Sequence, residues 1–230
     1  MYIFAGDSWA EKAFTPLNWQ HSRAEPGDVR LADYWHRPYQ AVTRPGGSNI
    51  DIMWDIVALQ TDWPIVWIWT EPGRDYGFVD DAGWTHGWMQ SELWQEKRRM
   101  AEFFILSEIQ RHIPNPIAFI GGLSDIDPDT VEEMGFDCLC SSWQGWIAAQ
   151  QPWSAFELGW GASDVGWRTH TIPNFRPGRS VTLAWDQQIK EWCAWEDSGW
   201  FCHEHPSPQA CEQFGTAMKP RVEAWLDECR

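Results

Sequence analysis

The chain has 230 residues, of which 43% are hydrophobic and 22% are charged. These proportions are those of a folded globular protein, and they exclude a largely disordered or collagen-like chain. The formal net charge of −16 repels phosphate backbones and anionic membrane surfaces, so we expect neither nucleic acid nor a membrane among the partners.

The first residues read as a strand, without the basic region and long apolar stretch of a signal peptide. The longest apolar run, residues 65–69, is too short to span a bilayer. Six cysteines occur without a paired C-x-x-C spacing, which favours small buried thiols in a reducing compartment over a disulfide framework. We therefore expect a cytoplasmic location.

Short apolar runs alternate with amphipathic stretches along the chain, a pattern typical of a parallel sheet with crossover helices. Strands are predicted at residues 2–5, 64–69, 117–120 and 136–139. Helices are predicted after Ser48, over 90–112, over 183–195, and from Ser207 to near the C-terminus. Pro208 at the first helical position supports the start of the last helix, and Pro220 is expected to kink or split it.

Residues 144–180 are rich in tryptophan, glycine and proline and show no clean period. We interpret this segment as a long loop of a single domain that spans residues 1–230. The chain has 20 tryptophans, which either fill the core or line a groove, because an indole offers a large contact area and one hydrogen-bond donor.

The Gly6-Asp7-Ser8 tripeptide directly follows the first predicted strand. In open parallel sheets, ligands bind at the carboxyl ends of the strands, so Ser8 lies where a catalytic group is expected. The alternative is a simple turn in which Gly6 supplies backbone freedom and Ser8 caps a helix.

Two further motifs precede predicted helices. The first runs from Arg44 to Asn49 and contains two glycines, whose N–H groups can bind an anion or an acyl-transfer oxyanion; a plain capped turn is the alternative. The second is Cys202-His203-Glu204-His205-Pro206-Ser207, in which a histidine can act as a general base. A metal site made from Cys202, His203, His205 and Cys211 is a weaker alternative, because the spacing matches no usual zinc pattern.

Together, the three motifs resemble those of the SGNH/GDSL hydrolases, in particular the small members found in phage genomes. The resemblance runs from Gly6 to the C-terminal helix and lies in the Gly-Asp-Ser, Gly-Gly-Ser-Asn and His-Pro-Ser segments. It implies a flavodoxin-like three-layer α/β/α sandwich with a central parallel sheet. It also implies hydrolysis of an ester, with Ser8 as the nucleophile, His205 as its base and Asp7 orienting the nucleophile loop through hydrogen bonds.

The resemblance further implies an oxyanion hole that includes the amides of Ser8 and Gly47. The family's oxyanion asparagine is absent; either Thr70 or Arg74 donates in its place, or the hole is one donor short. Cys202 stands where the family has its aspartate, which leaves Glu204, Asp197 or a serine–histidine dyad as alternatives.

The expected function is therefore a serine esterase that cleaves a small-molecule or carbohydrate ester, for example an acetyl ester, without a cofactor or metal. The alternative is a catalytically degenerate member of the same fold that binds a glycan or a protein, as a phage structural or accessory module. A phage-encoded protein of this kind would act in the host cytoplasm or be associated with the virion. A metal-dependent hydrolase built on the Cys202–His205 segment is the third possibility.

Overall fold

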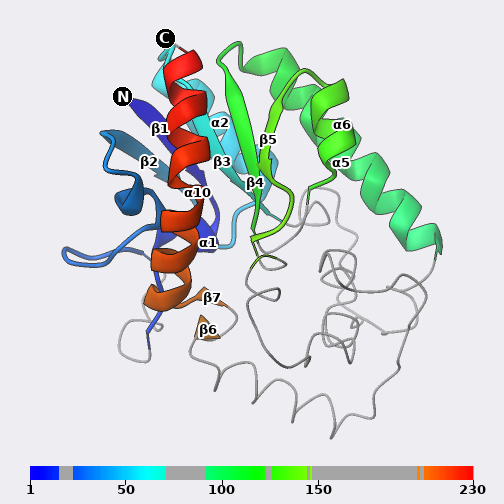
Figure 1. Ribbon diagram of the computed structural model, residues 1–230. Helices are drawn as coiled ribbons and strands as arrows, with labels where there is room; N and C mark the ends of the chain where they lie inside the picture. The colour runs from blue at the N-terminus through cyan, green and yellow to red at the C-terminus, as the bar shows by residue number, and fades with distance from the viewer. Residues whose placement is uncertain are drawn as a thin grey trace, which may run out of the picture.

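The structure is a computed structural model (Figure 1). It describes residues 1–15, 23–70, 92–122, 126–143, 146, 201–202 and 205–229.

A five-stranded sheet, parallel throughout, forms the centre of the described fold. Its strands are β1 (Tyr2–Gly6), β2 (Tyr39–Thr43), β3 (Ile65–Trp69), β4 (Ile117–Gly121) and β5 (Asp137–Cys140), in the spatial order β2-β1-β3-β4-β5. This is the flavodoxin-like order, in which the strand sequence reverses between β1 and β3. Ligand sites of such sheets lie at the carboxyl ends of the strands beside that reversal.

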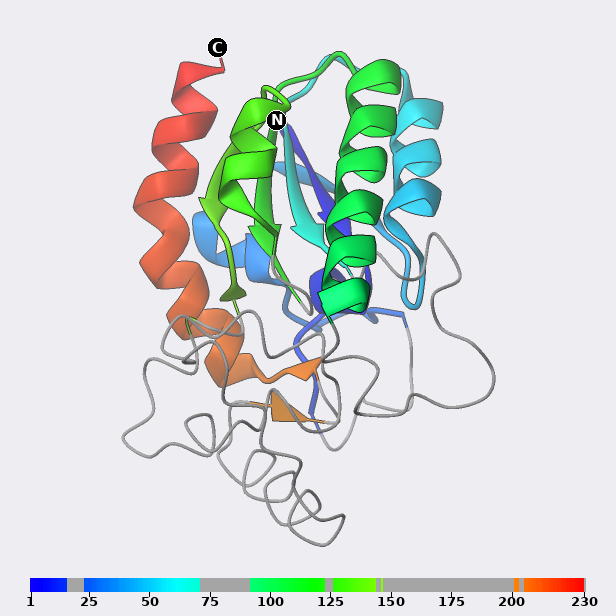
Figure 2. The same ribbon diagram turned by 90° about the vertical axis from the view of Figure 1, so that its right-hand side faces the viewer.

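Helices cover both faces of the sheet, which makes a three-layer sandwich (Figure 2). On one face lie α10 (Pro208–Glu228) and the 3₁₀ helix η1 (Leu31–Trp35); on the other lie α2 (Asn49–Leu59) and α5 (Glu92–His112). The central strands β1, β3 and β4 are buried throughout, and their residues alternate between the two cores: Phe4 belongs to the core on the α10 side, whereas Ile3 and Ala5 belong to the core on the α2 side.

The predicted strands and the helices α2, α5 and α10 are confirmed to within about two residues. Among the described elements, η1, β2, α6 (Pro128–Glu133) and the two-residue strands β6 (Phe201–Cys202) and β7 (His205–Pro206) were not predicted. The predicted helix 183–195 and nearly all of the predicted loop 144–180 lie outside the described residues.

The sequence predicts that Pro220 kinks or splits the last helix; a split does not occur, because α10 continues through Pro220 as one helix of 21 residues. Pro220 is exposed, so the helix position that lacks an N–H donor lies on the solvent side. Its neighbours Met218 and Val222 are buried in the core, and this packing holds both halves of the helix on the sheet.

Five tryptophans of the described part are almost completely buried, in agreement with the interpretation that many indoles fill the core: Trp9, Trp35, Trp67, Trp69 and Trp143. Trp54 on α2 is half exposed. Among the described residues, no helix is both long and apolar enough to cross a membrane.

Burial of several weak acids predicts a loss of stability at alkaline pH. Burial raises the pKa of Cys211 and Tyr2 above their ordinary values, and it raises the pKa of Cys138 and of Tyr39 to about 12. These groups keep their protons in the folded chain after the unfolded chain has released them, so the stabilisation is complete below about pH 8 and falls above it. We expect urea unfolding to give a smaller free energy at pH 10.5 than at pH 7, with a shallower fall in Tyr39→Phe; equal values at both pH values would contradict this.

Candidate active site

Ser8 lies at the carboxyl end of β1, beside the reversal in strand order. It begins the short helix α1 (Ser8–Glu11), whose N-cap Asp7 accepts a hydrogen bond from Trp9 N at 2.9 Å. Gly6 allows the sharp turn between strand and helix, since it has φ +153° and a Cβ there would lie 2.7 Å from Ala10 Cβ. Ser8 is only partly buried, in contrast to Asp7 and Trp9 on either side of it.

His205 reaches Ser8 from the other end of the chain. It belongs to the short strand β7 (His205–Pro206), which pairs with β6 (Phe201–Cys202) and leads directly into α10. Ser207 caps α10 by accepting from Ala210 N at 3.2 Å, and Pro206 O accepts from Phe14 N at 2.8 Å. These contacts fix β7 at both ends, and His205 Nε2 lies 2.8 Å from Ser8 Oγ. The predicted nucleophile and base therefore form a hydrogen-bonded pair across 197 positions of sequence.

A series of buried hydrogen bonds supports the turn that carries Ser8. Thr70, at the end of β3, donates from its hydroxyl to Asp7 Oδ2 at 2.7 Å. Asn49, at the start of α2, pairs with the Thr70 backbone: its Nδ2 donates to Thr70 O at 3.1 Å, and its Oδ1 accepts from Thr70 N at 3.3 Å. Asp7, Thr70 and Asn49 are all inaccessible to solvent. These hydrogen bonds tie together β1, β3 and α2, and Asp7 holds the turn that precedes Ser8.

Asn49 had no predicted role of its own. The sequence signal was its position after Ser48, which caps α2 by accepting from Asp51 N. A buried asparagine at the start of a helix needs partners for both ends of its amide, and the buried backbone of Thr70, just after the neighbouring strand, supplies them.

The expected oxyanion donors differ in whether other groups already accept their hydrogen bonds. Thr70 uses its hydroxyl proton on Asp7 and its N–H on Asn49, so in this structure neither hydrogen is directed at the expected oxyanion position. The Gly47 N–H donates to Arg44 O at 2.7 Å, which closes the turn before α2 and engages that hydrogen. The Ser8 N–H heads α1, where a helix offers it no carbonyl of its own. Arg74 lies outside the described residues.

The candidate acids Glu204 and Asp197 also lie outside the described part of the chain, as does His203. Cys211, one of the alternative metal ligands, is completely buried against the sheet, and burial raises the pKa of its thiol. That environment suits a neutral thiol in the core rather than a metal-bound thiolate. Within the described residues, no group of three or more histidine, cysteine or acidic side chains is placed to hold a metal ion.

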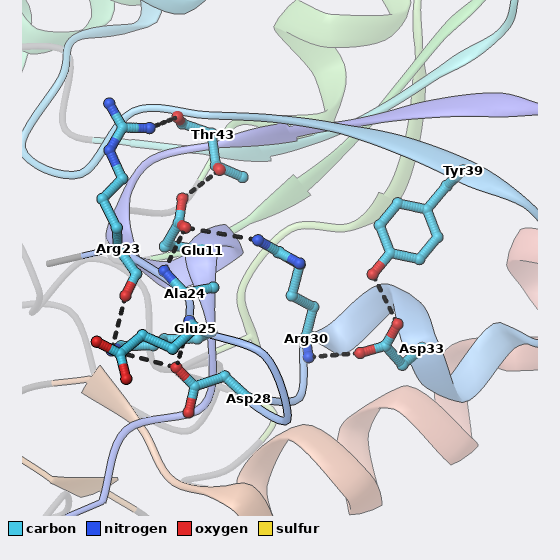
Figure 3. A network of polar contacts seen from close by, with 10 residues as sticks. Glu11, Arg23, Ala24, Glu25, Asp28, Arg30, Asp33, Tyr39 and Thr43 are labelled. Atoms are coloured by element: carbon cyan, nitrogen blue, oxygen red, sulfur yellow. Dashed lines mark hydrogen bonds and ion pairs between the residues drawn. The ribbon is translucent and has the colours of Figure 1, made fainter. Parts of the chain in front are cut away.

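Two charged residues that follow the serine are buried, and neither was predicted to matter. Glu11 accepts from Ala24 N at 2.7 Å and from the Thr43 hydroxyl, and it lies 3.5 Å from the Arg30 guanidinium (Figure 3). Lys12 donates to Arg23 O at 3.1 Å. Both side chains hold residues 23–30 against the helix that carries Ser8. Each buried charge is thereby paired, as burial requires.

Comparison with protein-family models, with curated proteins and with solved structures finds no match to this chain. The assignment of a function therefore depends on the geometry of the site and on the motifs that form it.

Proposed function

We propose that this protein is a serine hydrolase of the SGNH type that cleaves an ester through an acyl-enzyme on Ser8. The observation that supports it is the 2.8 Å contact between Ser8 Oγ and His205 Nε2 at the carboxyl end of β1. A nucleophile and a base within hydrogen-bond reach are the minimum requirement of covalent acyl transfer. The position beside the reversal in strand order is where an open parallel sheet places its ligand.

In the proposed reaction, Ser8 Oγ attacks the ester carbonyl carbon while its proton passes to His205 Nε2. The tetrahedral intermediate collapses, the bond to the leaving oxygen breaks, and His205 returns the proton to that alkoxide. Water then attacks the acyl-enzyme, giving one proton to His205, and the carboxylic acid leaves as Ser8 recovers its proton. The Ser8 N–H donates to the oxyanion in both halves of the reaction.

The proposed substrate is an ester of a small molecule or of a carbohydrate, such as an acetyl ester. This part of the proposal rests on the resemblance to the SGNH family.

A fluorophosphonate tests the activated serine. We expect intact mass spectrometry to show one adduct on the wild type, located on Ser8 by peptide mapping, and none on Ser8→Ala. Ser107→Ala is the matched control, since Ser107 lies on α5, where its hydroxyl donates to Phe103 O. The control should label like the wild type. A folded wild type that forms no adduct would refute the proposed hydrolase.

The second candidate is a catalytically silent protein of this fold that binds a glycan or a protein. It is favoured by the engagement of the Thr70 and Gly47 donors in internal hydrogen bonds, which leaves the oxyanion with fewer donors. Removing one such donor costs about 2.7–4 kcal/mol in a known serine protease. The absence of an adduct, together with an intact fold, would favour this candidate.

A further inference from the structure

The segment that leaves α1 contacts the catalytic base as well as the nucleophile. Lys12, which ends the helix, is extended, and residues 13–15 belong to no helix or strand. Ala13 N donates to Val29 O at 2.7 Å, and Phe14 N donates to Pro206 O at 2.8 Å. The backbone of this segment thus joins residues 23–29 to the strand that holds His205.

The Phe14 ring lies directly against the imidazole. The two ring centroids are 4.1 Å apart and the planes are tilted by 30°, which is close to a stacked arrangement. Phe14 is only 4% exposed. Its ring therefore has little freedom to move, and it limits the rotation of the His205 side chain about its own bonds.

A buried cation contacts the Phe14 ring in turn. Lys12 Nζ lies 5.4 Å from the ring centroid, within the range of a cation–π contact. The ammonium is itself held by Arg23 O at 3.1 Å and by the Asp28 carboxylate at 3.4 Å. Lys12 is 1% exposed, so water does not weaken these contacts.

We propose that Phe14 is a positioning residue for His205, with its ring anchored by Lys12. The ring holds the imidazole plane so that Nε2 faces Ser8 Oγ, and its π face stabilises the imidazolium that forms when His205 accepts the serine proton. In this way part of the orienting work that a carboxylate performs in a catalytic triad falls to an aromatic ring. The inference rests on the proposed function of the Ser8–His205 pair and extends it.

The experiment compares Phe14→Leu with Phe14→Tyr, because leucine keeps an apolar side chain but removes the π face, whereas tyrosine restores it. We expect Phe14→Leu to label with fluorophosphonate about tenfold more slowly than the wild type, and Phe14→Tyr to recover most of the rate. Phe136→Leu is the control: Phe136 is also largely buried, but it packs on the opposite face of the sheet. It should lose stability without losing labelling rate.

A second readout does not depend on reactivity. Ring protons of His205 that lie over the Phe14 face should be shifted upfield in the NMR spectrum of the wild type and of Phe14→Tyr, and should lose that shift in Phe14→Leu. Equal labelling of wild type and folded Phe14→Leu would overturn the positioning role and leave the proposed function intact. A wild type that does not label would instead refute the proposed function, and the positioning role with it.

Discussion

Replacement of His205 by glutamine is expected to slow fluorophosphonate labelling of Ser8, and ester hydrolysis, by about 10²- to 10⁴-fold. His205 Nε2 is 2.8 Å from Ser8 Oγ, and only a base at this place can take the proton as the serine attacks. Glutamine keeps a polar group of similar size near the serine, but its amide does not accept a proton at neutral pH. Binding of substrate should change little, so the loss should appear mainly in kcat.

His112→Gln is the matched control for this variant. His112 packs against Trp54 with ring centroids 4.9 Å apart and planes tilted by 51°, and it lies near Glu108 on α5. Both variants should unfold at nearly the same urea concentration as the wild type, because the Phe14–Pro206 backbone bond that anchors β7 does not involve the imidazole. Wild-type reactivity in folded His205→Gln would show that another group serves as the base.

Gly6→Ala is expected to cost about 3–5 kcal/mol of folding free energy, as the sum of two effects. The first is backbone strain, because φ at Gly6 is +153°, a region that L-residues rarely adopt. The second is overpacking, because the added Cβ would lie 2.7 Å from Ala10 Cβ and 2.9 Å from Ile68 Cβ. Backbone and side-chain atoms around the turn would have to move, and Ser8, two residues later, would move with them.

Two other glycines separate these effects. Gly135 has φ +78°, and its nearest neighbour to an added Cβ is the flexible end of Gln110 at 3.9 Å, so Gly135→Ala tests the backbone effect alone. Gly122 lacks a positive φ of this kind, but an added Cβ would lie 2.6 Å from Ile68 Cγ2, so Gly122→Ala tests overpacking alone. Urea unfolding followed by tryptophan fluorescence should rank Gly6→Ala as the least stable of the three. A loss at Gly6 no larger than at Gly135 would contradict the close packing around the turn.

The strands show which elements a local hydrophobic pattern can predict and which it misses. Runs such as residues 65–69 are apolar without alternation, as buried parallel strands are, and they appear in the structure nearly as predicted. β2 was missed because it lies at the edge of the sheet and only Val42 is fully buried, so its apolar signal is diluted. α6 has six residues and offers too short a stretch for a period to appear.

The cysteines and Pro220 also show what a local pattern predicts and what tertiary packing decides. The absence of a paired C-x-x-C spacing predicted small buried thiols; Cys211 is buried, whereas Cys138, Cys140 and Cys229 are only partly buried. Proline at position 220 predicted a break, but the local cost of a missing hydrogen bond is smaller than the gain from packing Met218 and Val222 on the sheet.

In the candidate site, too, some features follow from the sequence and others only from the tertiary structure. The sequence alone determined that Ser8 follows the first strand and that His205 directly precedes the last helix, because strand ends and helix caps are set by neighbouring residues. Only the tertiary structure decided that the two side chains meet at 2.8 Å, that Thr70 turns its hydroxyl to Asp7, and that Phe14 packs on the imidazole. Such contacts join residues far apart in the chain, and they depend on how the strands are ordered and how the layers pack, which no local pattern of residues encodes.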